Sequence, residues 1–364
     1  MRRILLFLLI FIVLDTFSLP VNRNFKIEKI IGNDQIETTF SVITDAVLTP
    51  CKDIIILDGK QDYIARFDWE GKLINQIGQK GRGAGDFLRP ASASIFNDKL
   101  YILDRFNNRF SESDLDLKNI RYFKLPYSIR MPRSLIVIGK NSFIVDNTSI
   151  IEPEAPKLGV IEITEKHNTE IKKLFFNHTP IDISSISEGI RTSRRLGQLF
   201  NVIFGIDHGK KRMLITFQNP DNPVCFYLYG MNGELIKQFS HQMDKKYSFP
   251  HYLYQTKKLS LNSLKGRYNL NADGVFYYDK HWYIFFSEHH YKSGDHDLRI
   301  TNIKKYSEIQ SFYLEFDENG KFLGKFNTDP DFLCFDISED GYVLGKHPES
   351  EAEQLVIYKI LKDR

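Results

Sequence analysis

Short apolar runs separated by turn residues make up most of the chain. Phe, Tyr, Ile, Leu and Val cluster in runs of about five to seven residues, and pairs such as Asn-Gly, Asp-Gly and Glu-Gly stand between them. This spacing is typical of strands joined by hairpins, whereas patterns with the helical period are scarce. The pattern therefore predicts an all-β protein.

One apolar strand recurs six times along the chain, which indicates a repeat architecture. Each copy is followed by further predicted strands. In three units a turn between the later strands contains a glycine, which is Gly71, Gly233 or Gly320. The six copies are Asp53–Asp58, Lys99–Asp104, Asn141–Asp146, Arg212–Phe217, His281–Phe286 and Asp340–Gly345. Units of four strands repeated in this way predict a six-bladed β-propeller.

The two ends of the repeat complement each other. The last unit contains only three predicted strands, and Phe25–Ile31 provides a spare strand before the first unit. Pairing the two would close the ring and leave no exposed sheet edge. We expect one domain, residues 19–364, in which an N-terminal strand completes the C-terminal blade. The expected blades are approximately residues 40–77, 91–124, 134–176, 200–239, 270–326, and 331–360 together with 25–31.

Residues 1–18 have the pattern of a secretory signal peptide. Arg2 and Arg3 precede an uninterrupted apolar run, Ile4–Leu14, and small residues follow it at Thr16 and Ser18. The run is shorter than the about 20 residues that a membrane span requires. We expect cleavage, no integral membrane span afterwards, and export to the periplasm, the cell surface or the medium.

Charge and cysteine content exclude some functions. The formal net charge is +3, and loss of residues 1–18 lowers it to +2, so no electrostatic footprint for nucleic acid is expected. The three cysteines, Cys51, Cys225 and Cys334, allow at most one disulfide. The apolar share of 42% is ample for a large core, and we expect a monomer.

A glycine-rich loop precedes the second repeat strand. Because Pro90 and a strand follow it, the loop does not open a helix and is not a phosphate-binding loop. The residues of this motif are Gly78, Gly81, Gly83, Gly85, Phe87, Pro90, Asp104, Asn107 and Arg109.

This stretch resembles the NHL-type repeat, and the whole chain is similar to exported bacterial six-bladed propellers of the NHL and TolB-like type. The resemblance implies a binding or scaffolding module, although some relatives are lyases or calcium-dependent lactonases.

The residues that end the six repeat strands form the candidate site, because a propeller brings them to one mouth of its central channel. One interpretation is a pocket for a cationic, calcium-bearing or sugar ligand. The other is that each Asp caps the turn after its strand. The candidate ligand-binding residues are Asp58, Asp104, Asp146, Phe217 and Phe286.

We therefore expect an exported, non-catalytic propeller that binds a protein or a small ligand, without a cofactor and without an assigned catalytic residue. The alternative is a calcium-dependent hydrolase, similar to lactonases, or a lyase, with Asp58, Asp104 and Asp146 as metal ligands. The group Glu288-His289-His290 contains metal-ligating side chains, but its spacing matches no known metal motif and favours a polar loop.

Overall fold

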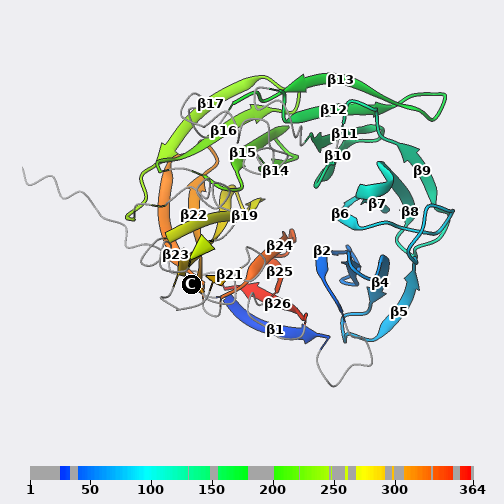
Figure 1. Cartoon of the computed structure of the whole chain (residues 1–364), viewed down its shortest axis with the longest axis horizontal. Coiled ribbons are helices and arrows are strands. Elements are labelled where there is room, and N and C mark those ends of the chain that lie inside the picture. The colour runs from blue at the N-terminus through cyan, green and yellow to red at the C-terminus, as the bar shows by residue number, and fades with distance from the viewer. Residues whose placement is uncertain are drawn as a thin grey trace, which may run out of the picture.

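The computed structural model shows six four-stranded antiparallel sheets arranged in a ring (Figure 1). The all-β, six-bladed propeller expected from the repeats is confirmed. The structure describes residues 25–32, 40–129, 131–147, 155–178, 201–220, 222–245, 247, 259–260, 268–291, 297–298, 307–328, 331–346 and 353–361.

Within each blade the strands follow one another from the channel outward. The first three blades consist of β2 (Ile43–Leu48), β3 (Ile54–Asp58), β4 (Tyr63–Phe67) and β5 (Leu73–Ile77); β6 (Pro90–Phe96), β7 (Lys99–Asp104), β8 (Arg109–Asp114) and β9 (Arg121–Lys124); and β10 (Leu135–Gly139), β11 (Ser142–Asp146), β12 (Leu158–Ile163) and β13 (Thr169–Phe175). A short 3₁₀ helix, η1 (Arg105–Asn107), connects β7 to β8.

The other three blades follow the same plan. They consist of β14 (Val202–Asp207), β15 (Arg212–Phe217), β16 (Val224–Gly230) and β17 (Leu235–His241); β19 (Tyr268–Tyr278), β20 (His281–Tyr291), β22 (Ser307–Asp317) and β23 (Phe322–Asn327); and β24 (Leu333–Ile337), β25 (Tyr342–Lys346), β26 (Leu355–Ile360) and β1 (Phe25–Ile31). Two short strands, β18 (Leu259–Ser260) and β21 (Asp297–Leu298), pair outside the blades.

The hydrophobic core lies between the blades. Six clusters of buried side chains occur, and each combines residues of two neighbouring blades. In β3, Ile54 and Ile56 pack toward the sixth blade, while Ile55 and Leu57 pack toward the second. Because a middle strand is covered on both faces, its sequence is continuously apolar rather than alternating. The outermost strands, such as β5, are largely exposed.

The ring closes as expected from the two ends of the repeat. β1 pairs antiparallel with β26 from Phe25 opposite Ile360 to Ile31 opposite Leu355, and Figure 1 shows these strands side by side in blue and red. Ile31 is fully buried. The first strand of the described chain therefore completes the last blade.

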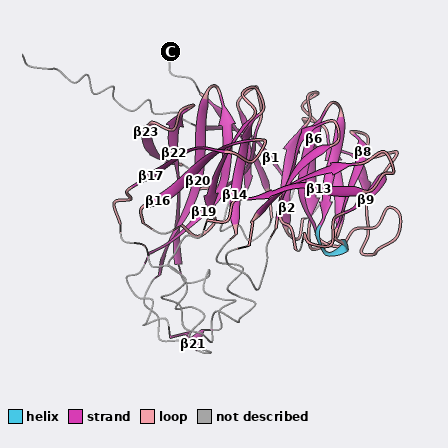
Figure 2. Cartoon of the chain, turned by 90° about the horizontal axis from the view of Figure 1, so that it is seen from above, coloured by secondary structure: helices cyan, strands magenta, loops and turns pink. Residues whose placement is uncertain are grey.

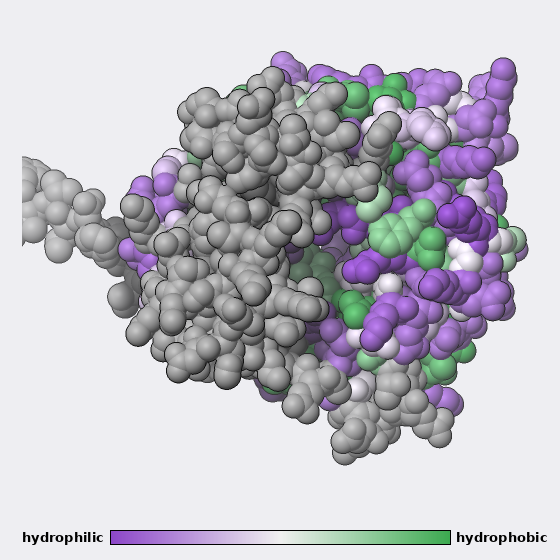
Figure 3. All heavy atoms as spheres, in the orientation of Figure 1, coloured by the Kyte–Doolittle hydropathy of each residue, from purple (hydrophilic) through white to green (hydrophobic). Residues whose placement is uncertain are grey.

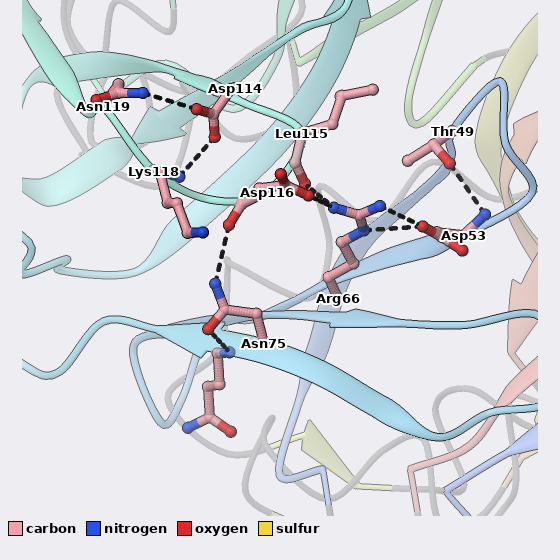
Figure 4. A network of polar contacts seen from close by, with 10 residues as sticks. Thr49, Asp53, Arg66, Asn75, Asp114, Leu115, Asp116, Lys118 and Asn119 are labelled. Carbon is pink, nitrogen blue, oxygen red and sulfur yellow. Dashed lines mark hydrogen bonds and ion pairs between the residues drawn. The ribbon is translucent and has the colours of Figure 1, made fainter.

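Polar contacts join neighbouring blades on the outside of the core. The Arg66 guanidinium on β4 forms ion pairs with Asp53 of its own blade and Asp116 of the second blade (Figure 4). Its Nη1 also donates to the Leu115 carbonyl oxygen, and the Asn75 side-chain amide donates to the Asp116 carbonyl oxygen at 2.9 Å. These bonds fix the position of the third-to-fourth strand turn of blade 2 against blade 1.

Two further expectations concern membranes. The predicted signal peptide, residues 1–18, lies outside the described residues. Within the part of the chain that the structure describes, no helix has the length and hydropathy needed to cross a bilayer.

Candidate functional site

All second strands of the blades end on one side of the ring. This side carries Asp58, Asp104, Asp146 and Phe217, and it also carries η1; we call it the η1 face. Figure 2 shows η1 and β21 on the same side of the disc. Figure 3 shows this face, whose uncovered part is mainly hydrophilic and is hollowed near the ring axis, with apolar side chains beside the hollow.

The structure buries the five predicted ligand-binding side chains. Each of them has a relative exposure of 2% or less. They are Asp58, Asp104, Asp146, Phe217 and Phe286. Contact between these five residues and a ligand therefore stays a prediction from the sequence.

The three aspartates accept hydrogen bonds from the chain that enters their own blade. Asp58 accepts from the backbone amides of Ser41, at 2.6 Å, and of Lys60 and Gln61 in the following turn. Asp146 accepts from the amides of Arg133 and Ser134 at 2.6 and 2.7 Å. Each buried carboxylate therefore binds the end of its strand to the segment that enters the blade, and Asp58 also binds the turn that follows it. The bonds of Asp58 to this turn match the capping role considered for these acids.

The NHL-like motif holds the glycine-rich loop against β7 and β8. The Arg109 guanidinium pairs with Asp104 at 2.9 Å and donates to the carbonyl oxygens of Arg82, Gly83 and Asp86. The Asn107 amide donates to the Gly81 carbonyl oxygen and to Asp104.

The glycines and Phe87 of this motif allow the loop to fold so closely. Gly78 and Gly85 have φ angles of 104° and 83°, a region that favours glycine. A Cβ at Gly81 or Gly83 would collide with the Asp86 carboxylate, and Phe87 is fully buried. Pro90 begins β6.

A β-bulge recurs at one level in the innermost strands of four blades. In each case it follows the residue that pairs with the last residue of the predicted repeat strand, which is Asp58, Asp104, Phe286 or Gly345. The expectation that Phe286 and Gly345 end their strands is wrong, because β20 and β25 continue to Tyr291 and Lys346. The bulged steps are Ile43–Asp45, Pro90–Ser92, Ala272–Gly274 and Cys334–Asp336. A bulge adds one residue and changes the direction in which side chains point, and it is common beside functional sites. Several polar side chains lie at or directly after these bulges.

Three of those side chains are carboxyl groups in consecutive blades: Asp273, Asp336 and Asp45, which we call the channel acids. They lie half-buried on the innermost strands β19, β24 and β2. Asp45 accepts from the Ala93 amide of the next blade at 2.8 Å, and the Leu48 amide donates to Asp336 in the same way. Ser287 donates to Asp273 at 3.2 Å.

Two of the channel acids, Asp45 and Asp336, have raised pKa values. Burial, with the neighbouring charge of Asp336, raises the pKa of Asp45 to about 8, although two backbone amides oppose the shift. Burial also raises the pKa of Asp336 to about 6. At neutral pH the Asp45 carboxyl is therefore mainly protonated, and the Asp336 carboxyl is mainly ionised. A channel with these groups can both donate and accept hydrogen bonds.

Cys334 lies beside the channel acids but is not a reactive thiol. It is buried, and burial together with the charges of Asp336, Asp273 and Asp45 raises its pKa. All three cysteines, Cys51, Cys225 and Cys334, are unbridged in the structure.

The polar loop predicted for Glu288-His289-His290 is wrong, because these residues lie within β20 and pair with strands on both sides. Glu288 is buried and accepts from the Tyr247 hydroxyl at 2.6 Å and from Lys245, and the His290 ring stacks on Tyr268. Among the residues that the structure describes, no three His, Cys, Asp or Glu side chains are close enough to hold a metal ion.

The bulges left a weak signal in the sequence. In β2 the buried positions Ile43 and Ala46 are three residues apart, where a regular strand would have a spacing of two. Reading only the ends of the second strands located the η1 face, but it missed Asp45, Asp273 and Asp336 on the adjacent first strands.

Known families and structures agree with this architecture. The family DUF5128, described as "6-bladed beta-propeller", matches residues 36–194. A member of the DUF4221 family from Bacteroides vulgatus is similar over 94% of this chain and 100% of its own, with a TM-score of 0.58 and 10% identity. A Bacteroides fragilis protein assigned as exported is similar over 93% and 95%, with a TM-score of 0.53 and 12% identity. No curated protein matches in sequence. These structural similarities extend to the fold alone.

Proposed function

We propose that this chain is an exported, non-catalytic binding propeller that receives a polar ligand into the η1 end of its channel. The observation that carries the proposal is that three half-buried carboxyl groups, Asp45, Asp273 and Asp336, lie at or directly after the bulges of the innermost strands of three consecutive blades. Rigid strands that present polar groups in a hollow are the usual basis of specific small-ligand sites.

The chemistry of the channel acids supports a ligand with hydroxyl or amino groups. A protonated carboxyl of Asp45 beside an ionised Asp336 offers both a donor and an acceptor.

A thermal-shift screen of sugars, amino acids and organic acids tests this proposal. We expect the shift caused by a binding compound to disappear in Asp336→Asn and to persist in Asp98→Asn, which alters an exposed carboxylate at the β6–β7 turn. A compound series whose shifts are the same in both variants would contradict binding at the channel acids.

Export and the kinship with NHL and TolB-like propellers are further parts of the proposal. The contacts of Asp104, Asn107 and Arg109 with the glycine-rich loop support the kinship. For export, a reporter enzyme fused after residue 24 should be found outside the cytoplasm. The N-terminal residue of the processed fusion protein should be residue 19 of this chain. A cytoplasmic reporter that retains Met1 would contradict export.

A second candidate function is a hydrolase or lyase with Asp45 as acid and Asp336 as base. The observation in its favour is the difference between their raised pKa values, about 8 and about 6, because acid–base pairs separate in this way. Turnover of lactones or activated esters with a maximum between these pH values, lost in Asp45→Asn, would establish it. A calcium-dependent version also requires that millimolar calcium raise the melting temperature.

A further inference from the structure

Three arginines gather at the η1 face beside the channel: Arg89, which precedes β6, Arg105 in η1, and Arg133, which precedes β10. We call them the mouth arginines. Backbone bonds bring the first two together, because the Arg105 amide donates to the Arg89 carbonyl oxygen and the Phe106 amide donates to that of Leu88. The guanidinium carbons of Arg89 and Arg105 lie 5.9 and 5.7 Å from the centre of the Phe106 ring.

Four other arginines of the described chain have carboxylate partners, whereas two of the mouth arginines have none there. Ion pairs with carboxylates are formed by Arg66, Arg109, Arg121 and Arg212. In the part of the chain that the structure describes, the guanidinium groups of Arg89 and Arg105 form none, and the buried Nε of Arg105 has no hydrogen-bond partner. A buried donor without a partner is unfavourable, so a ligand that accepts a hydrogen bond from it gains affinity.

The surrounding charges leave the cluster positive. Burial and the charges of Arg133 and Arg89 lower the pKa of Arg105 to about 10, and Asp146 opposes the shift. Asp146 already accepts from the Arg133 and Ser134 amides, and Asp62 accepts from the Arg89 amide. The Arg133 guanidinium is anchored across the gap to blade 4, where it donates to the Gln218 side-chain oxygen at 2.7 Å.

From this geometry we infer that the mouth arginines bind an oxyanion, that is, a carboxylate, sulfate or phosphate group of a ligand. Guanidinium groups match the paired oxygens of such groups. Phe106 is 45% exposed and offers an apolar surface next to the anion site. This inference goes beyond the proposed function and does not depend on the channel acids.

Calorimetric titration of the full chain with sodium sulfate, sodium phosphate and sodium acetate, at constant ionic strength, tests the inference. We expect saturable 1:1 binding, and a dissociation constant raised about tenfold or more in Arg105→Gln and in Arg133→Gln. Sulfate and phosphate on one side and acetate on the other distinguish a tetrahedral from a planar oxyanion. The control is Arg82→Gln, which removes an exposed arginine of the glycine-rich loop and should bind as the wild type does.

Stability separates a binding role from a structural one. Without anion, Arg105→Gln should raise the unfolding midpoint, because it removes a half-buried charge that repels two neighbours. Arg109→Gln should lower the midpoint, because it leaves Asp104 buried without its ion pair. No saturable binding by the wild type, equal binding by Arg105→Gln, or an equal loss in Arg82→Gln would each overturn the inference. Unchanged binding by Asp336→Asn is expected and keeps this test separate from that of the channel acids.

Discussion

Two opposing effects act on the pKa of the Asp45 carboxyl group. Backbone amides of Ala93 and Ala46 donate to it and favour the ionised form, whereas burial and the charge of Asp336 favour the protonated form. Burial is the largest of these effects, so the pKa of Asp45 is raised. The free energy of unfolding therefore depends on whether the Asp45 carboxyl in the channel is protonated.

A pH-dependent stability follows from this pKa. The folded protein keeps the Asp45 proton up to about pH 8, while the unfolded chain releases it near the ordinary value of 3.8. Stability should therefore fall as the pH rises between these values, by at most about 1.4 kcal/mol per pH unit from this group. Urea unfolding between pH 4.5 and 8 should show this slope reduced in Asp45→Asn and retained in Asp98→Asn. An identical slope in wild type and Asp45→Asn would contradict the assignment.

At the scale of elements, the innermost strands determine both the channel and the contacts between blades. Bulges in β2, β19 and β24 accompany the three channel acids. In β14, which pairs with β15 in uninterrupted register, Gly205 instead allows close contact with β19. A Cβ at Gly205 would overlap the Val275 carbonyl group, whose position is fixed by the sheet.

Gly205→Ala should therefore destabilise the contact between the fourth and fifth blades. The strands must separate or the backbone must shift, and we expect a loss of about 2 kcal/mol or more in the free energy of unfolding. The matched control is Gly139→Ala on β10, where the nearest atom to a new Cβ is the Ser142 Cβ at 3.6 Å. Denaturant unfolding of both variants measures the difference. Equal stabilities would show that β14 and β19 are not as close as described.

The sequence predicts strands and turns better than it predicts side-chain direction. Runs such as Ile54–Asp58 are continuously apolar because both faces are covered, and Gly71, Gly233 and Gly320 have the positive φ angles that their turns require. A bulge depends on how two paired strands fit together. The direction of the Asp45 side chain therefore cannot be predicted from the sequence of its own strand. Of the mouth arginines, Arg89 and Arg105 belong to the second blade and Arg133 to the third, so only the packing of these two blades brings all three together.

At the scale of the whole molecule, β1 completes the ring by covering the edge of β26. The Phe25 ring contacts Phe332 and Tyr313 at centroid distances of 5.4 and 5.6 Å, so β1 also contributes to the contact between the fifth and sixth blades. Ile31 adds a fully buried side chain at the other end of the strand.

Removal of residues 1–31 should destabilise the propeller by about 3 kcal/mol or more, because buried side chains are lost and an unpaired edge appears. The edge should also promote association, which light scattering detects. Removal of residues 1–24 is the control, since it leaves β1 intact, and should cost little by comparison. If both truncated proteins melt at the same temperature and stay monomeric, β1 is not a structural part of the ring.

The pairing of Phe25 with Ile360 has a consequence for the order of folding. β1 is synthesised long before β26, its pairing partner. The blades between them in the sequence can therefore pack on one another before the ring closes. Contacts between such distant segments slow the final step. Until the two strands pair, the chain presents a free strand edge that can bind a strand of another molecule.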